Sequence, residues 1–298
     1  MTQDAVPRLR PMTFTDLIDA TVSLYRRNFA LFAGVVAVLA VPEAIINTLL
    51  TISTVSSPIT TSKANGSTNF HFNPVFPVAA GATAVIGFLF GIVITGALAQ
   101  AISARYLGEP MTVGRAYGSV GVGRFAALAA ASVLSGIVIA LPVIVAAGIF
   151  VLLLVAHAPV IAIVLAAIVL FVAGAVLAIC IWVRLQFIPQ AIVIERLSIG
   201  GGFRRSWALV SGSAWRVFGI VLLISLIVGG IEGVVGLVFA GVLSVFSHPA
   251  ATLVSSLVDT LILPAQFGAF TLLYYDLRVR KEGFDLEHLA NHLAVNPA

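Results

Sequence analysis

The stretch that decides the fold reads Ser198-Ile-Gly-Gly-Gly-Phe-Arg-Arg-Ser-Trp-Ala-Leu-Val-Ser-Gly-Ser-Ala-Trp-Arg-Val-Phe218, and the apolar block 219–246 follows it directly. Helical spacing at i, i+4, i+8 and i+11 puts four apolar residues on one face: Ile199, Phe203, Trp207 and Val210. Two basic residues, Arg204 and Arg205, lie off that face. Such a helix is too polar to cross a bilayer, so we expect it to lie flat in the headgroup region behind an N-cap at Ser198.

Two further segments repeat this pattern. Thr13–Phe29 precedes the apolar block 30–52, and Thr112–Phe125 precedes the block 126–155. Each segment combines a capping residue, an amphipathic helix and an Arg-Phe pair or near-pair before the apolar block. The sequence therefore predicts a threefold internal repeat covering residues 13–106, 112–188 and 198–275, followed by a cytoplasmic tail, 276–298.

The composition is that of a polytopic membrane protein. Apolar residues make up 60% of the chain and charged residues 9%, and the mean hydropathy is +1.12. Soluble globular domains carry roughly 25% charged residues. The predicted fold is all-α, with six transmembrane helices paired as three hairpins: 29–52, 78–106, 125–155, 160–188, 218–246 and 250–275. The polar segment 53–77 is predicted as a flexible loop outside the membrane.

The distribution of positive charge predicts the orientation. Lys63 is the only one of the 16 Lys and Arg residues that falls in a segment predicted on the outer side. Basic residues accumulate on the cytoplasmic side of membrane proteins, so both termini are expected in the cytoplasm. The basic character thus reflects topology, and we expect no nucleic-acid partner.

Seven arginines in or next to the predicted interfacial helices are candidates for binding lipid headgroups: Arg26, Arg27, Arg115, Arg124, Arg204, Arg205 and Arg216. Clustered arginines at the cytoplasmic surface attract anionic lipid phosphates. The alternative interpretation is that these residues only set the topology and anchor the helices.

Polar residues within the predicted spans form a second set of candidates: Glu43, Glu232, Asp259 and Gln266. An acid at the bilayer centre costs roughly 2.5–3.5 kcal/mol on insertion scales, so such residues are functional candidates. They favour either a proton- or cation-coupled transport site or a polar headgroup cavity. The other interpretation is that they hydrogen-bond between helices and fix the packing.

No pattern in the chain indicates catalysis. A Gly-x-Ser-x-Gly elbow and a phosphate-binding Gly-Lys-Ser/Thr loop are both missing from the sequence. Cys180 is the single cysteine, and the His288/His292 pair has no evident third metal ligand. We therefore expect no enzymatic activity, no cofactor and no metal.

The following segments carry a resemblance to a known family: Arg10–Phe29, Phe203–Trp207 with Trp215–Phe218, and Tyr275–Leu286. Together they resemble the membrane domain attached to some bacterial glycerophosphoryl diester phosphodiesterases, which also occurs alone without an established function. The resemblance implies a prokaryotic plasma membrane. The phosphodiesterase activity of that family belongs to a separate α/β-barrel domain, so no catalytic residue is carried over.

Three functions are compatible with the sequence. The first is a non-catalytic protein with a structural or lipid-interacting role at the cytoplasmic leaflet. The second is a small transporter or channel, which requires a continuous polar path through Glu232, Asp259 and Gln266. The third and least supported is a membrane-bound hydrolase, because no histidine shares a block with the acids.

Overall fold

The computed structural model describes residues 10–52, 59–64, 67–157, 159–240 and 248–286. The chain divides into two compact units, the first made of 1–7, 12–121 and 222–273 and the second of 8–11, 122–221 and 274–298. Six helices within the described residues are long and apolar enough to cross a membrane: Phe29–Leu49, Val75–Tyr106, Val113–Val155, Val160–Ile194, Ala214–Val238 and Ser256–Glu282. The predicted helical, multi-pass architecture with six spans is therefore supported.

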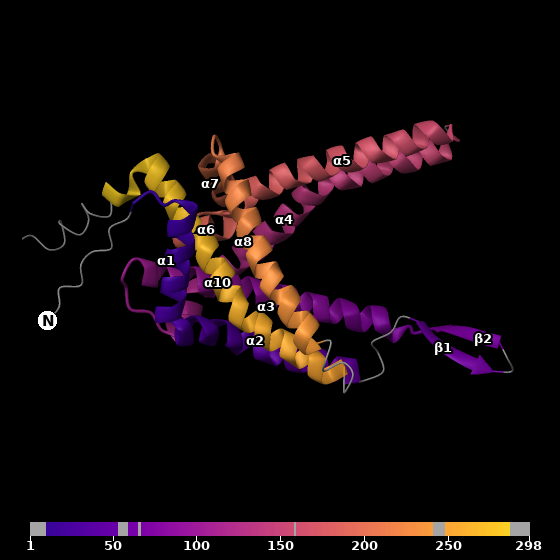
Figure 1. The fold of residues 1–298 in the computed structure, drawn as a ribbon, viewed down its shortest axis with the longest axis horizontal. Helices are drawn as coiled ribbons and strands as arrows, with labels where there is room; N and C mark the ends of the chain where they lie inside the picture. The colour runs from indigo at the N-terminus through magenta and orange to yellow at the C-terminus, as the bar shows by residue number, and fades with distance from the viewer. Residues whose placement is uncertain (1–9, 53–58, 65–66, 158, 241–247, 287–298) are drawn as a thin grey trace, which may run out of the picture. The chain divides into compact units, whose positions relative to one another are not determined.

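In the first unit, α2 (Phe29–Ile52) and α3 (Val75–Tyr106) pack against each other (Figure 1). The preceding helix, α1 (Phe14–Arg27), runs crosswise to α2 at its start (Figure 1). The remaining residues of this unit come from three further helices: the start of α4 (Val113–Val155), the second part of α8 (Ala214–Val235) with the π-helical segment η1 (Gly236–Ala240), and most of α10 (His248–Glu282).

The sequence of α1 explains where the helix begins and which of its residues are buried. The Thr13 hydroxyl accepts a hydrogen bond from the Asp16 amide (3.2 Å), and the Asp16 carboxylate accepts one from the Thr13 amide (3.0 Å). Leu17 and Thr21 are buried, and the Tyr25 hydroxyl donates a 2.7 Å hydrogen bond to the Leu261 carbonyl of α10. The predicted apolar face of α1 thus contacts protein along α10, whereas the sequence assigned it to lipid.

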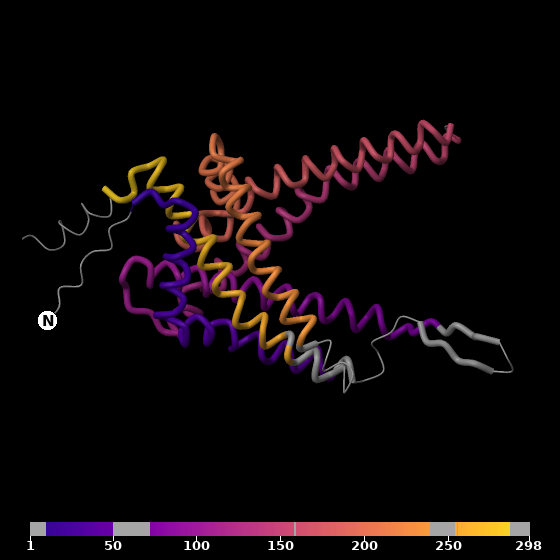
Figure 2. The backbone as a smooth tube through the Cα atoms, in the orientation of Figure 1, coloured from indigo at the N-terminus to yellow at the C-terminus, as the bar shows by residue number. Residues whose placement is uncertain are grey.

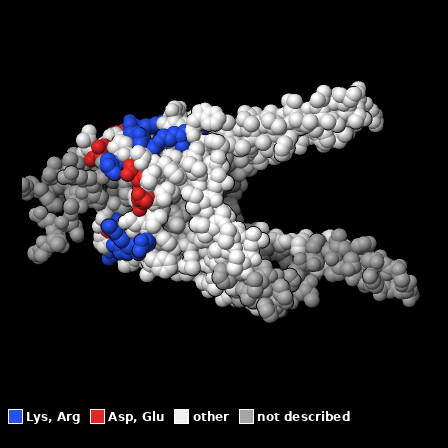
Figure 3. Space-filling model, viewed as in Figure 1, with Lys and Arg blue, Asp and Glu red and all other residues white. Residues whose placement is uncertain are grey.

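In the second unit, α4 (Val113–Val155) and α5 (Val160–Leu185) run together as an antiparallel hairpin (Figure 2). Residues 126–183 contain no Asp, Glu, Lys or Arg, and this hairpin is white in the space-filling view (Figure 3). Gly174 allows close contact, because a Cβ there would lie 3.4 Å from the Pro142 carbonyl oxygen. The helix α4 contains Pro142 and is interrupted at Gly121, whose backbone is not helical.

The short helices α6 (Ile188–Ile194) and α7 (Ile199–Val210) pack tightly on each other. A Cβ on Gly202 would meet Ile192 at 2.8 Å, which only glycine avoids. The Ser206 hydroxyl donates to the Arg184 carbonyl (2.7 Å) and accepts from the Phe187 amide (3.1 Å), which fastens α7 to the end of α5. The buried face of α7 therefore follows Gly202 and Ser206, while Trp207, predicted to share the apolar face, stays exposed.

Three hydroxyl side chains cap helices at the predicted starts. Besides Thr13, Thr112 accepts a hydrogen bond from the Arg115 amide (3.4 Å) and Ser198 accepts one from the Gly201 amide (3.3 Å). The second and third of these helical segments are interrupted before Phe125 and Phe218, because Gly121 (φ 55°) and Gly212 (φ 77°) adopt a positive φ that stops the helix.

The predicted outer loop is not structureless. Strands β1 (Ile59–Ala64) and β2 (Ser67–Phe72) form an antiparallel hairpin that pairs Ala64 with Ser67. The intervening dipeptide Asn65-Gly66 is the strongest sequence signal for a two-residue hairpin turn, and the flanking Thr, Ile and Phe residues favour strands. The loop prediction missed this signal.

The last span also extends beyond its predicted end. The helix α8 (Ala214–Val235) precedes it, and α10 (His248–Glu282) runs seven residues past Tyr275, where the tail was expected to begin. It ends at Gly283 (φ 64°), whose amide donates to the Val279 carbonyl (3.2 Å). The tail prediction beyond residue 286 lies outside the described residues.

Candidate functional site

The first candidate site lies on α1, on the side turned away from α10. Arg26 and Arg27 are exposed in the last turn of the helix. They line a hollow of about 540 Å³ on this helix. The other lining residues lie one or two helical turns earlier and are Asp19, Val22 and Ser23. Red and blue side chains gather over α1 in Figure 3. The hollow thus offers two guanidinium groups and one hydroxyl beside a single carboxylate.

The second unit contains an ion-pair cluster centred on Arg205. Its guanidinium donates to Glu195 (Nη2–Oε1, 2.8 Å) and also to Glu282 (Nη2–Oε2, 2.7 Å). Hydrogen bonds with Glu282 first, and then with Glu195, raise the pKa of Arg205 above its ordinary value. Two carboxylates thus bind this guanidinium, which the sequence indicated as a candidate for lipid contact.

Residues of α10 complete the cluster. The Tyr274 hydroxyl donates to Glu195, and the Arg278 guanidinium lies 3.5 Å from Glu195 and 3.4 Å from Glu282. Arg278 also stacks on Phe284, with its Cζ 4.0 Å from the ring centroid. The cluster therefore joins α7, the residue that follows α6, and the C-terminal turns of α10.

A second carboxylate on the same turns of α10 binds two more arginines. Asp276 is fully buried and contacts Arg216 (2.6 Å) and Arg280 (3.0 Å). Lys281 donates to the carbonyl groups at the end of α7, those of Ala208 (3.2 Å) and Ser211. Arg216, a predicted lipid contact, is thus engaged by Asp276.

The other predicted headgroup residues fall in both units. Arg115 belongs to the first unit with Arg26 and Arg27, and it is exposed. Arg124 and Arg204 belong to the second, where Arg204 is exposed and Arg124 half-buried. Exposed guanidinium groups on α1, at the start of α4 and on α7 remain candidates for lipid contact.

Two of the predicted intramembrane polar residues lie near each other. The carboxyl group of Glu232 on α8 is close enough to that of Asp259 on α10 for the two to interact electrostatically. Glu232 is half-buried and Asp259 is exposed. Gln266 is half-buried two helical turns further along α10.

The remaining acid, Glu43 on α2, contacts a different helix. A Cβ on Gly87 of α3 would lie 2.7 Å from the Glu43 carboxylate oxygen, so the glycine makes room for the acid. Glu43 therefore lies at the α2–α3 contact. Within the described residues, no group of three or more His, Cys, Asp or Glu side chains is arranged to hold a metal ion.

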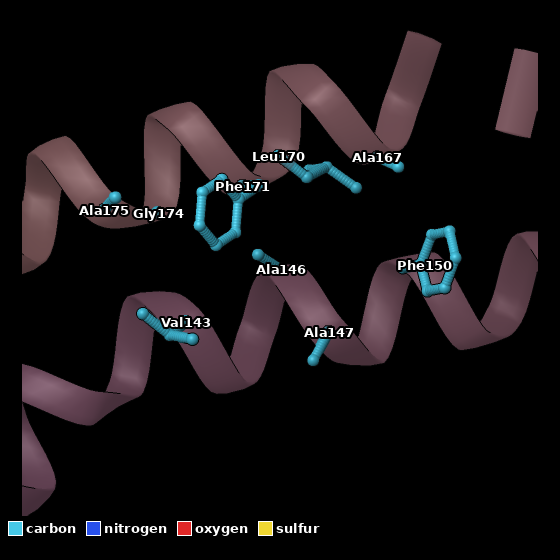
Figure 4. A pocket seen from close by; sticks show the side chains of 9 residues that line it. All are labelled: Val143, Ala146, Ala147, Phe150, Ala167, Leu170, Phe171, Gly174 and Ala175. Carbon is cyan, nitrogen blue, oxygen red and sulfur yellow. The ribbon is translucent and has the colours of Figure 1, made fainter. Parts of the chain in front are cut away.

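A separate hollow of about 250 Å³ lies between α4 and α5 (Figure 4). Its lining is almost entirely apolar, with Phe150 of α4 and Phe171 of α5 as the largest side chains. Their surroundings are small residues that leave the gap open, among them Ala146, Ala147 and Gly174. This hollow offers only apolar contact.

The ion-pair cluster around Arg205 was not predicted from the sequence. Spacings of four residues between Asp276 and Arg280 and between Arg278 and Glu282 are typical of helical ion pairs, and they indicate that the helix continues past Tyr275. No local signal links Glu195 to Arg205 or Tyr274, because their proximity depends on tertiary packing.

Fold and site together define a multi-pass helical membrane protein with charged surfaces at its helix ends. The chain belongs to the family described as Domain of unknown function (DUF7847), whose model matches residues 12–277. No curated protein and no solved structure matches the chain. Since the family description states no function, the resemblance to the membrane domain of glycerophosphoryl diester phosphodiesterases stays a prediction.

Proposed function

We propose that the protein is a non-catalytic integral membrane protein that binds anionic lipids at the cytoplasmic leaflet. The observation that carries the proposal is the hollow on α1, where Arg26 and Arg27 are exposed beside Ser23. Two adjacent guanidinium groups and a hydroxyl match the oxygen atoms of a phosphate. The hollow also contains the apolar side chain of Val22, which is 49% exposed and suits the glycerol and acyl part of a lipid.

The arrangement of α1 within its unit supports a position in the headgroup layer. If α2 crosses the bilayer, a helix crosswise to α2 at its start lies along the membrane surface (Figure 1). Contacts of Thr21 and Tyr25 with α10 hold α1 in place, and Arg26 and Arg27 stay exposed.

We further propose the threefold repeat of a capped short helix and a membrane hairpin. Hydroxyl caps at Thr13, Thr112 and Ser198 each accept from the amide three residues later, which supports equivalent starts. The distribution of Lys and Arg and the family resemblance favour a prokaryotic plasma membrane with both termini in the cytoplasm.

The experiment that tests lipid binding measures the lipid retained by the purified protein. Replacing Arg26 and Arg27 with Gln should weaken the affinity of the α1 hollow for anionic lipid by about fivefold per arginine and so reduce the lipid retained, since each basic residue near an anionic surface contributes about 1 kcal/mol. Lipids are extracted after purification in mild detergent and quantified by mass spectrometry.

Two matched variants control this measurement. Arg26→Lys with Arg27→Lys keeps the charge and should keep most of the lipid, and Asp19→Asn removes the opposing carboxylate and should increase retention. Unchanged anionic lipid in the double Gln variant would reject the proposed site on α1.

A transport role is the second candidate, favoured by the proximity of Glu232 and Asp259 within candidate spans. Paired acids in a membrane bind protons or cations. In vesicles containing the protein and a pH-sensitive dye, a transporter predicts a proton or cation flux that Glu232→Gln with Asp259→Asn abolishes. Equal flux in vesicles with and without protein would reject this candidate.

A further inference from the structure

All three tryptophans of the sequence belong to the second unit and lie next to helix ends. Trp182 is in the last turn of α5, Trp207 is on α7, and Trp215 is in the first turn of α8. Their side chains are 36%, 44% and 86% exposed, respectively. Exposed indole rings are unfavourable in water but concentrate at membrane–water interfaces, where the ring contacts acyl chains and the N–H group contacts polar groups.

Two arginines flank the middle tryptophan. The Arg184 guanidinium stacks over the Trp207 ring, with its Cζ 4.4 Å from the centroid. Arg204 is exposed on α7, one helical turn before Trp207. The hydrogen bond between Ser206 and the Arg184 carbonyl (2.7 Å) fixes α7 against the end of α5, which holds Arg184 and Trp207 together.

Arg184 and Arg204 differ from the other arginines nearby, whose charges are balanced by carboxylates. Arg205, Arg216 and Arg278 contact carboxylates of Glu195, Asp276 or Glu282. Within the described part of the chain, no ion pair is found for Arg184 or Arg204. Arg184, which stacks on Trp207, and Arg204, on the same helix as Trp207, therefore carry positive charge that no carboxylate of the described residues is seen to balance.

We propose that the aromatic–arginine band, formed by Trp182, Arg184, Arg204, Trp207 and Trp215, binds the phosphate of an anionic phospholipid and sets the level of the bilayer interface on the second unit. A guanidinium stacked on an indole keeps its N–H edges available for a bidentate contact with phosphate. The inference rests on the proposed lipid-binding function, but it assigns a second surface and different residues. A lipid fits better than free phosphate, because the indole rings require apolar contact.

Intrinsic fluorescence reports on this band directly, because the protein has no other tryptophan. The full chain is placed in phosphatidylcholine–phosphatidylglycerol vesicles whose acyl chains carry bromine near the headgroup or near the chain end. Bromine near the headgroup should quench the emission more strongly than bromine near the chain end, and iodide in the buffer should quench weakly. Strong iodide quenching without bromine quenching would overturn the proposal and indicate that the band faces water or a soluble partner.

Lipid retention tests the charged part of the band. Arg184→Gln with Arg204→Gln should weaken the affinity of the band for phosphatidylglycerol by about fivefold per arginine and so reduce the amount retained, and the matched Lys variant should retain it. Circular dichroism and size-exclusion chromatography establish that both variants fold. Inorganic phosphate added during purification should not displace the lipid; complete displacement would assign the arginines to free phosphate and overturn the lipid assignment.

The α1 variants distinguish failure of this inference from failure of the proposed function. If Arg26→Gln with Arg27→Gln loses lipid while the Arg184/Arg204 variant retains it, the band is rejected and the α1 site stands. If only the Arg184/Arg204 variant loses lipid, the band stands and the α1 site is rejected.

Discussion

At the scale of single residues, carboxylates decide which arginines are available to ligands. Arg205 makes paired hydrogen bonds to Glu195 and Glu282, while its neighbour Arg204 is exposed. Charge-assisted, two-pronged contacts of this kind are stronger than single neutral hydrogen bonds. Adjacent arginines in one helix therefore have different roles.

Replacing Glu195 with Gln should destabilise the second unit. The change removes the charged acceptor for Arg205, Tyr274 and Arg278, with an expected cost of about 1–3 kcal/mol at this partly exposed site. Thermal unfolding in detergent, followed by circular dichroism, should give a lower midpoint. Arg204→Ala on the same helix as Arg205 is the control and should leave the midpoint nearly unchanged; equal effects of the two variants would contradict the role of the cluster.

Tyr25 gives a pH-dependent contact between α1 and α10. Burial raises the pKa of Tyr25 above its ordinary value, so its contribution to stability is complete below pH 10 and declines as pH rises above that value. Tyr25→Phe should cost about 1 kcal/mol at neutral pH. The difference in unfolding midpoint between the two proteins should narrow in alkaline buffer, and a difference that widens would contradict this sign.

At the scale of secondary-structure elements, single glycines separate the short helices from the spans. Gly121 has φ 55° and ψ 154°, a conformation essentially restricted to glycine. It divides α4 between the capped turns after Thr112 and the long apolar helix. The position of this break depends on one backbone conformation.

Gly121→Ala should therefore destabilise the protein by about 1–3 kcal/mol, because alanine is strained in this conformation. Gly118→Ala is the matched control: it lies in the helical part of α4, and a Cβ added there would have no other atom within 4 Å, so the change should be neutral or stabilising. Unfolding midpoints of both variants test the prediction. An equally stable Gly121→Ala protein would show that the break is not required.

At the scale of the whole molecule, the six candidate spans and the distribution of basic residues define a testable topology. Three candidate spans, Val75–Tyr106, Val113–Val155 and Val160–Ile194, separate the β1–β2 hairpin from α7 along the chain. If all three cross the bilayer, the proposed topology predicts that the hairpin and α7 lie on opposite sides of the membrane. In a Cys180→Ser background, Thr61→Cys in β1 should react with an impermeant maleimide in intact cells. Ser211→Cys should react only after permeabilisation, and labelling of both from one side would reject the topology.

Much of the architecture is predictable from sequence because it depends on local or one-dimensional signals. Long apolar blocks give the spans, and hydroxyl residues give the caps at Thr13 and Ser198. The buried faces of the short helices differ from the apolar faces predicted from the sequence. Leu17 contacts protein where lipid was expected, and Trp207 is exposed while Ser206 is buried, because the choice of face depends on the partner helix.

The sequence by itself determined a helical membrane protein with six apolar helices, since transfer of a long apolar segment into lipid depends on composition and length alone. Tertiary structure alone decided that Arg205 binds Glu195 and Glu282, that Arg184 stacks on Trp207, and that Glu232 approaches Asp259. Those pairs are distant in sequence, and electrostatic and stacking energies fall off within a few ångströms, so only the packing of the helices brings them into range.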